Sequence, residues 1–224
     1  MEKRFYLESL GCARNQVDSN AMSGLLKAAG WRPTPDPSAA GVIVVNTCGF
    51  IEPAAEESID AILELARMKR DGECRRLIVA GCLPERYREA IGEALPEVDV
   101  FLGTGALQEV AAAAEGRLDA ACRLPDPAGC RFPETLGGWV RPMDHLAYLK
   151  IAEGCVRRCT YCIIPKLKGT QRSRPVETLA SEAESLVREG VKEIVLVAQD
   201  TTHYGRDMVD PTDLSALLRA LSSR

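Results

Sequence analysis

The chain of 224 residues lacks any long run of apolar residues. The first apolar stretch, Phe5–Leu10, is far too short for a secretory signal peptide, and no later segment approaches the length of a membrane span. These absences predict a cytoplasmic protein with no membrane partner.

Histidine and aromatic residues are scarce, whereas cysteine is not. The chain has two histidines, 5% aromatic residues and nine cysteines. Because the cytosol keeps thiols reduced, these cysteines are not expected to form a disulfide framework, and metal or cluster ligation is the leading explanation for several of them. The net charge of -4 argues against a general nucleic-acid binder, so no stable nucleic-acid partner is expected.

Apolar runs alternate with amphipathic segments, a pattern that predicts an α/β fold with a parallel sheet. The early strands are expected at Phe5–Leu10, Val42–Val45, Leu77–Ala80 and Val98–Leu102. The helices between them are expected from a cap at Asp18 or Ser19 to Gly30, and over Pro53–Met68, Pro84–Leu95 and Leu107–Ala114.

The pattern fails between residues 116 and 142, which contain four prolines and four glycines. The sequence therefore predicts two domains, 1–140 and 141–224. The second domain is expected to begin a new βα series: a strand at His145–Glu153, a helix at Pro175–Glu189, a strand at Glu193–Ala198 and a helix from Pro211.

Cys155, Cys159 and Cys162 form a CxxxCxxC motif directly after the predicted strand. Three closely spaced thiolates can hold three irons of a 4Fe-4S cluster and leave the fourth iron open to a small molecule. A structural zinc site requires four closed ligands. The nearest histidine, His145, lies on the predicted strand, so the spacing favours a cluster over zinc.

Cys12, Cys48 and Cys82 each follow a predicted strand by one to three residues. Because the carboxyl ends of parallel strands share one edge of a sheet, the three loops can converge on one cluster. Small residues packing in tight turns would explain the same placement. The other cysteines of this region, Cys74, Cys122 and Cys130, do not share it and are interpreted as ordinary thiols.

The segment from Cys155 to Pro165, with Tyr161 before the last cysteine of the motif, resembles the radical S-adenosylmethionine (SAM) enzymes. The resemblance implies that the open iron takes the amino and carboxylate groups of SAM, and that reduction cleaves SAM to a 5'-deoxyadenosyl radical. Tyr161 would lie beside the adenine, with a ring packed in the loop as the alternative. Gln199, at the end of the next predicted strand, could also reach SAM, with strand capping as the alternative.

The segments Ser9–Ser19, Asn46–Glu52 and Ala80–Leu83 resemble the amino-terminal domain of the radical SAM methylthiotransferases. The resemblance implies that Cys12, Cys48 and Cys82 carry a second 4Fe-4S cluster, which handles the inserted sulfur. Judged against that family, the radical SAM barrel is incomplete here and the chain is truncated at its carboxyl end. We therefore expect these 224 residues to bind clusters but to turn over poorly.

The run Gln199–Thr202 and the continuation of the Cys48 segment resemble the RimO-type branch, although Asn20 departs from its pattern. That branch implies an enzyme that adds a methylthio group to the β-carbon of an aspartate in ribosomal small-subunit protein twelve, with a reductant such as flavodoxin or ferredoxin. A tRNA adenosine methylthiotransferase and a non-catalytic iron–sulfur binding fragment are the alternatives.

Overall fold

The structure is a computed structural model that describes residues 3–129 and 143–223. It divides into two compact units, Met1–Gly138 and Trp139–Arg224, and each is described by itself. Among the described residues, none of the helices combines the length and the apolar character that crossing a membrane requires.

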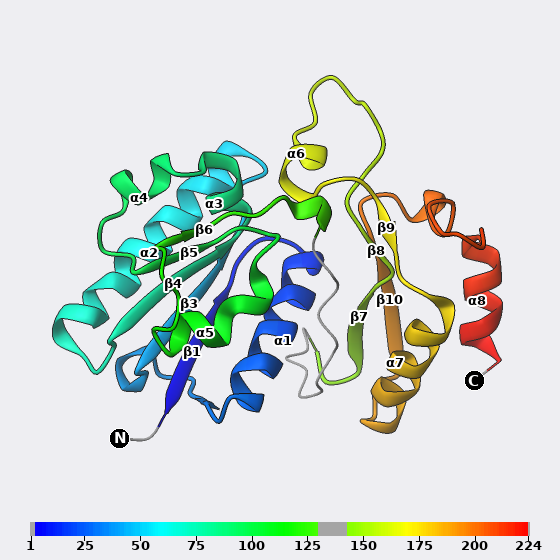
Figure 1. The fold of residues 1–224 in the computed structure, drawn as a ribbon. Helices are drawn as coiled ribbons and strands as arrows, with labels where there is room; N and C mark the ends of the chain where they lie inside the picture. The colour runs from blue at the N-terminus through cyan, green and yellow to red at the C-terminus, as the bar shows by residue number, and fades with distance from the viewer. Residues whose placement is uncertain (1–2, 130–142, 224) are drawn as a thin grey trace. The chain divides into compact units, whose positions relative to one another are not determined.

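The first unit is built on a single parallel sheet with the strand order β2-β1-β3-β4-β5-β6 (Figure 1). Its strands are β1 (Arg4–Ser9), β2 (Arg32–Pro33), β3 (Val42–Thr47), β4 (Arg76–Gly81), β5 (Val100–Leu102) and β6 (Cys122–Arg123). The four expected strands are confirmed. The two edge strands, β2 and β6, were not predicted because two residues are too few to show a period.

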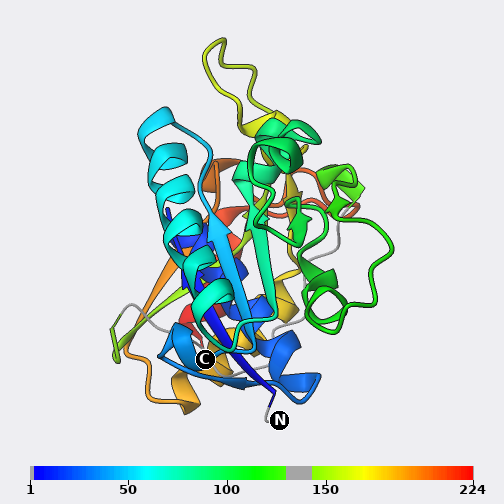
Figure 2. The same cartoon turned by 90° about the vertical axis from the view of Figure 1, so that its left-hand side faces the viewer.

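Helices cover both faces of this sheet, as alternate side chains of β3 show. Val42 and Val44 pack with residues of α1 (Ala13–Ala28), η2 (Leu107–Glu109) and α5 (Val110–Ala114). Ile43 and Val45 pack on the opposite face with α2 (Glu52–Asp71), α3 (Cys82–Tyr87) and α4 (Ala90–Ala94). Figure 2 shows α2, in cyan, lying across its face of the sheet. Burial on both faces explains why β3 is a continuous apolar run.

Two helix predictions for the first unit are wrong. The first helix begins at Ala13 with Cys12 at the N-cap position, not at Asp18 or Ser19, both of which are buried within α1. A single helix was expected over Pro84–Leu95, but the chain forms α3 and α4. Arg88 separates them because its φ of 55° lies in the left-handed region.

The second unit pairs β7 (Leu146–Lys150) with β10 (Glu193–Val197) in parallel. The crossover includes α6 (Ile164–Lys168) and α7 (Val176–Arg188), and α8 (Leu214–Ser222) follows β10 through η4 (Thr201–His203). Leu149, Leu179 and Leu217 are fully buried in its core.

The strand expected over 145–153 is divided in two. After β7, the residues of β8 (Ala152–Glu153) pair with β9 (Arg172–Ser173) in antiparallel fashion. The last helix starts at Leu214 instead of directly after Pro211, because Asp213 is its N-cap and accepts a hydrogen bond from the amide of Ala216 at 2.7 Å.

Candidate metal centres

The first three cysteines follow adjacent strands of the parallel sheet. Ser9 of β1 pairs with Asn46 of β3, and Thr47 pairs with Gly81 of β4. The chain leaves β1 for α1 on one face and leaves β3 for α2 on the other. Cys12 and Cys48 therefore lie at a topological switch point, the place where open α/β sheets bind ligands.

The loops that carry these cysteines pack against one another. A Cβ atom added to Gly11 would lie 3.3 Å from Cys48 Sγ, and one added to Gly49 would lie 3.0 Å from the carbonyl oxygen of Cys82. Cys12 is exposed, Cys48 is half-buried and Cys82 is buried. The exposure of the three cysteines therefore decreases from Cys12 to Cys82, which directly follows β4.

In the part of the chain that the structure describes, no three His, Cys, Asp or Glu side chains form a group that could hold one metal ion. That result concerns a single ion. The sulfurs that bind a 4Fe-4S cluster lie about 6 to 7 Å apart, because two metal–sulfur bonds and an Fe–Fe edge separate them. The sulfur separations within both cysteine sets stay predictions.

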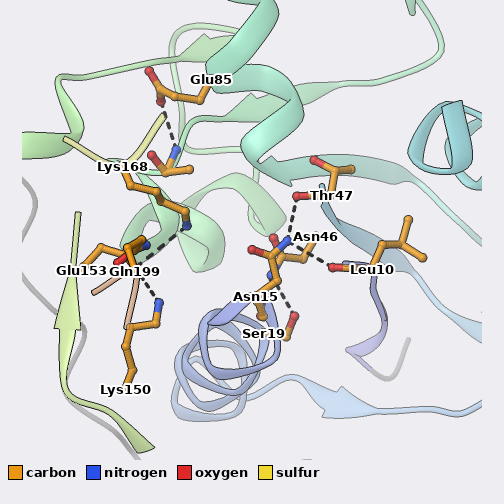
Figure 3. Close-up of polar contacts among 11 residues, drawn as sticks. Leu10, Asn15, Ser19, Asn46, Thr47, Glu85, Lys150, Glu153, Lys168 and Gln199 are labelled. Atoms are coloured by element: carbon orange, nitrogen blue, oxygen red, sulfur yellow. Dashed lines mark hydrogen bonds and ion pairs between the residues drawn. The ribbon is translucent and has the colours of Figure 1, made fainter. Parts of the chain in front are cut away.

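Two buried asparagines connect the first two cysteine loops (Figure 3). The Asn15 side-chain amide donates to the carbonyls of Leu10 at 3.1 Å and Thr47 at 2.9 Å. The Asn46 amide donates to the carbonyl of Asn15 and to Ser19 Oγ, both at 2.9 Å. Both asparagines are 1% exposed, so these bonds replace water for carbonyl groups beside Cys12 and Cys48.

Two hydroxyl groups complete this support. Ser58 Oγ, from α2, accepts from the amide of Cys48 at 3.1 Å and contacts the carbonyl of Cys48 at 3.0 Å. Thr47 Oγ1 donates to the carbonyl of Ala80 at 2.6 Å and accepts from the amide of Leu83 at 3.3 Å. Sequence reasoning did not identify these residues. The sequence does contain one sign of this support, because the polar residues Asn46 and Thr47 end an otherwise apolar strand.

Glu85 on α3 is a buried carboxylate three residues after Cys82. It pairs with Arg88 at 2.6 Å and accepts from the amide of Thr104 at 3.1 Å. Loss of solvent raises the pKa of Glu85 even though Arg88 opposes the shift. The carboxylate joins the helix after Cys82 to the turn after β5.

The remaining described cysteines do not lie in the loops that follow β1, β3 and β4. Cys74 precedes β4 and donates from Sγ to the carbonyl of Arg76 at 3.3 Å, and Cys122 lies in β6. Burial raises the pKa of both thiols, which disfavours the thiolate that metals bind. These contacts agree with their interpretation as ordinary thiols. Cys130 lies outside the described residues.

The second three cysteines lie in the loop between β8 and α6. The amide of Cys155 donates to the carbonyl of Gly169 at 3.1 Å, and the amide of Cys162 donates to the carbonyl of Cys159 at 3.1 Å. Cys155 and Cys162 are half-buried, and Cys159 is exposed. Tyr161 is 88% exposed, so the alternative of a ring packed within the loop is wrong.

Gln199 belongs to a polar network around Glu153, which lies two residues before Cys155 (Figure 3). Lys150 Nζ lies 2.6 Å and Lys168 Nζ 3.9 Å from Glu153 Oε2, while Gln199 Nε2 donates to Glu153 Oε1. Burial would raise the pKa of Glu153, but the two lysines lower it. Gln199 Oε1 is buried and has no hydrogen-bond partner among the residues that the structure describes.

Two family models match the chain. Residues 4–103 match the uncharacterized protein family UPF0004, and residues 149–222 match the radical SAM superfamily. The chain is also similar to a solved structure of the radical S-adenosylmethionine methyltransferase TsrM from Kitasatospora setae, with cobalamin and a [4Fe-4S] cluster bound. The TM-score is 0.58 at 17% identity, and the match covers 90% of this chain and 50% of TsrM. The match and the two models confirm the fold class: a parallel-sheet βα domain followed by the first βα units of a radical SAM (β/α) partial barrel.

Several curated relatives carry the name ribosomal protein uS12 methylthiotransferase RimO. The chain is 52% identical to the protein from Desulfosudis oleivorans, covering 98% of this chain and 50% of the relative. It is 50% identical to that of Anaeromyxobacter sp. strain K and 46% identical to that of Geobacter sulfurreducens, covering 99% of this chain each time and 47% and 50% of the relatives. The chain therefore spans about half the length of these relatives.

The radical SAM match after an amino-terminal parallel-sheet domain defines the class of protein, a radical SAM protein with a preceding α/β domain. Within that class, the chain belongs to the radical SAM methylthiotransferase family, among its RimO-type members.

Proposed function

We propose that this chain is the cluster-binding part of a methylthiotransferase that modifies the β-carbon of an aspartate in ribosomal protein uS12. The observation that carries the proposal is the presence of two separate sets of three cysteines, one in each compact unit, in the segments that follow strands. The RimO name of the curated relatives supports the substrate.

Cys12, Cys48 and Cys82 would hold one 4Fe-4S cluster in domain 1–140, and Cys155, Cys159 and Cys162 would hold the other in domain 141–224. The donor chemistry fits, because each set supplies three thiols and leaves one iron for an exogenous ligand. The close packing of Gly11 on Cys48 and of Gly49 on Cys82 supports a shared first site. When bound, the clusters and SAM supply the reductive cleavage and radical chemistry that this family uses.

Gln199 is proposed to orient SAM. Its amide nitrogen already donates to Glu153, so the side chain offers as a hydrogen-bond acceptor its buried Oε1, which has no partner in the described part of the chain. The amino group of SAM carries N–H donors of the matching kind. Tyr161 leaves most of its ring accessible and would cover the adenine. A reductant of the flavodoxin or ferredoxin class would deliver the electrons, and the cytoplasmic location stays a prediction from the sequence.

Counting iron tests the two sites. Anaerobically reconstituted protein should hold roughly eight irons per chain, and the triple change of Cys155, Cys159 and Cys162 to alanine should remove about half. Cys74→Ala and Cys122→Ala are the controls and should keep the full count. Loss of all iron in the triple variant would leave a single cluster site and would contradict the proposal.

Mass spectrometry tests the substrate. The full-length enzyme, incubated with SAM, sulfide and reductant, should add a methylthio group to uS12, whereas these 224 residues alone should do so poorly. Modification of tRNA adenosine in place of uS12 would favour the tRNA branch. Cluster binding without SAM cleavage by the full-length enzyme would favour an iron–sulfur binding protein.

A further inference from the structure

Two consecutive residues after β10 contact the chain on both sides of Cys155. Gln199 donates to Glu153, two residues before Cys155, and Asp200 Oδ2 accepts from Arg157 Nε at 2.8 Å, two residues after it. The two side chains therefore bracket a single cysteine. Both contacts join segments more than forty residues apart in the sequence.

We propose that Glu153 and Asp200 are positioning residues that hold Cys155 in a set relation to Gln199. The inference rests on the proposed function, in which Cys155 binds an iron and Gln199 binds SAM. It adds a coupling between cluster binding and SAM binding: in this proposal Gln199 binds SAM, and Gln199 and Asp200 together also hold the segment that carries Cys155. Neither Glu153 nor Asp200 needs to touch SAM for this role.

The contact before Cys155 is made to a buried carboxylate that is also paired with lysines. Glu153 is 8% exposed, and its partner Lys150 on β7 is 2% exposed. A buried carboxylate is retained in its charged form only with close partners, which Lys150 and Lys168 provide here. Glu153 therefore links Lys150 of β7, Lys168 of α6 and Gln199 just before the cysteine loop begins.

The contact after Cys155 is more exposed but is also fixed at both ends. Asp200 is held by Thr202, whose amide lies 3.1 Å and whose hydroxyl lies 2.6 Å from Asp200 Oδ1. The amide of Arg157 approaches Cys155 Sγ at 3.4 Å. The hydrogen bonds from Thr202 and the ion pair with Arg157 lower the pKa of Asp200, which favours its carboxylate form.

The backbone leaves Cys155 little freedom between the two contacts. Its amide is bonded to Gly169, and Gly154 has a φ of 81°, with the carbonyl of Thr170 occupying the space of a side chain. The position of the Cys155 sulfur thus depends on the two side-chain contacts and on this short backbone segment.

A double-mutant cycle on the exposed contact tests the inference. The full-length protein would carry Cys12→Ala, Cys48→Ala and Cys82→Ala, so that electron paramagnetic resonance reports only the remaining cluster. In Arg157→Gln and in Asp200→Asn, the SAM concentration that half-converts the spectrum should rise about two- to fivefold, the range for a partly exposed ion pair. The double variant should be no worse than either single variant.

Arg158→Gln is the matched control, since it removes the same charge from the same loop and Arg158 has no side-chain partner among the described residues. It should leave the SAM titration unchanged. An equal shift in Arg158→Gln, or additive shifts in the double variant, would show a general charge effect and overturn the inference. Absence of iron in the background protein would instead remove the proposed cluster site itself.

A change at the buried Glu153 also affects stability, so its test needs a control variant that loses a buried carboxylate elsewhere in the same unit. Glu153→Gln and Glu182→Gln each neutralise a buried carboxylate of this unit, but Glu153 lies two residues before Cys155, whereas Glu182 lies on α7 and pairs with Arg174. We expect both variants to lower the melting temperature and only Glu153→Gln to raise the half-conversion concentration, by about tenfold. Equal SAM titrations in the two variants at equal iron content would rule out a positioning role for Glu153.

Discussion

Asn15 shows how one buried side chain can support a cysteine without touching a ligand. Its amide satisfies the carbonyls of Leu10 and Thr47, which lie next to the two loops that carry Cys12 and Cys48. Buried carbonyl groups left without a partner cost more than the bond itself contributes. At this scale, the sites depend on residues that are not ligands.

Changing Asn15→Ala should lower the free energy of unfolding by about 1–3 kcal/mol, because two carbonyls lose their donor. Urea denaturation of the cluster-free chain measures this. Gln16→Ala is the control, since that half-buried side chain makes no hydrogen bond to the described residues, and its effect should stay within about 0.5 kcal/mol. Equal losses in the two variants would contradict the assigned role.

Glu85 should make stability depend on pH. Its folded pKa lies above the ordinary value of 4.5 because burial outweighs the pairing with Arg88. The folded state therefore binds the proton more tightly than the unfolded state. The contribution is fully present below about pH 4.5 and is lost as the pH rises through the folded pKa.

Glu85→Gln should flatten the dependence of the unfolding free energy on pH in the range above 4.5. Urea melts of the cluster-free chain at successive pH values would reveal the change of slope. Glu93→Gln, which alters an exposed carboxylate, should keep the original slope. A Glu85→Gln curve parallel to that of the unchanged protein would argue that Glu85 titrates normally.

At the scale of elements, the turn from β4 into α3 sets the place of Cys82. Gly81 has φ 99° and ψ -142°, a region reserved in practice for glycine, and an added Cβ atom would lie 2.5 Å from Asn46 Oδ1 and 2.8 Å from the carbonyl of Thr47. The strand can therefore pass close to β3 only because this residue has no side chain.

Gly81→Ala should destabilise the first unit by more than about 2 kcal/mol, since backbone strain and a steric clash add together. Gly30→Ala separates the two effects: Gly30 also has a positive φ, 85°, but nothing lies within 4 Å of the added atom. It should cost only about 1 kcal/mol. Thermal unfolding compares the variants, and equal melting temperatures would mean that the clash is relieved at no cost.

At the scale of the whole molecule, the second unit leaves an apolar groove uncovered. The groove has a volume of about 500 Å³ and lies between α7, β10 and α8, and Val187 and Leu218 at its margin are 59% and 46% exposed. Among the described residues β10 pairs only with β7. The described βα units therefore leave apolar side chains of α7 and α8 exposed.

This groove should bind the apolar dye anilinonaphthalene sulfonate. Combining Val187→Lys and Leu218→Lys should lower the dye fluorescence by about half, because the two residues supply much of the exposed apolar surface. Val209→Lys makes the same chemical change at a side chain that is 98% exposed and outside the groove, and should leave the signal unchanged. Similar decreases in all variants would show that the dye signal does not come from this groove.

Local patterns in the sequence were sufficient for the class of fold and for the choice of six cysteines as candidate ligands. The apolar run Val42–Val45 identifies a buried strand because both of its faces need cover, and the CxxxCxxC spacing is short enough for one loop to contain it. The positions of the four early strands followed from the same short-range information, whereas the division of 145–153 into β7 and β8 did not. The places of Cys12 and Cys48 after neighbouring strands could be inferred because parallel strands end at a common edge.

The tertiary structure alone decided which side chains support those cysteines. Ser58 reaches Cys48 from a different element, and Glu153 meets Gln199 across 46 positions, so no local period reveals either contact. The start of α1 was misplaced for the same reason: Ser19 resembles a cap in sequence, but its hydroxyl bonds to Ser9 and Asn46 inside the fold. Buried polar groups take whichever partner packing brings within reach, and packing is a property of the whole chain.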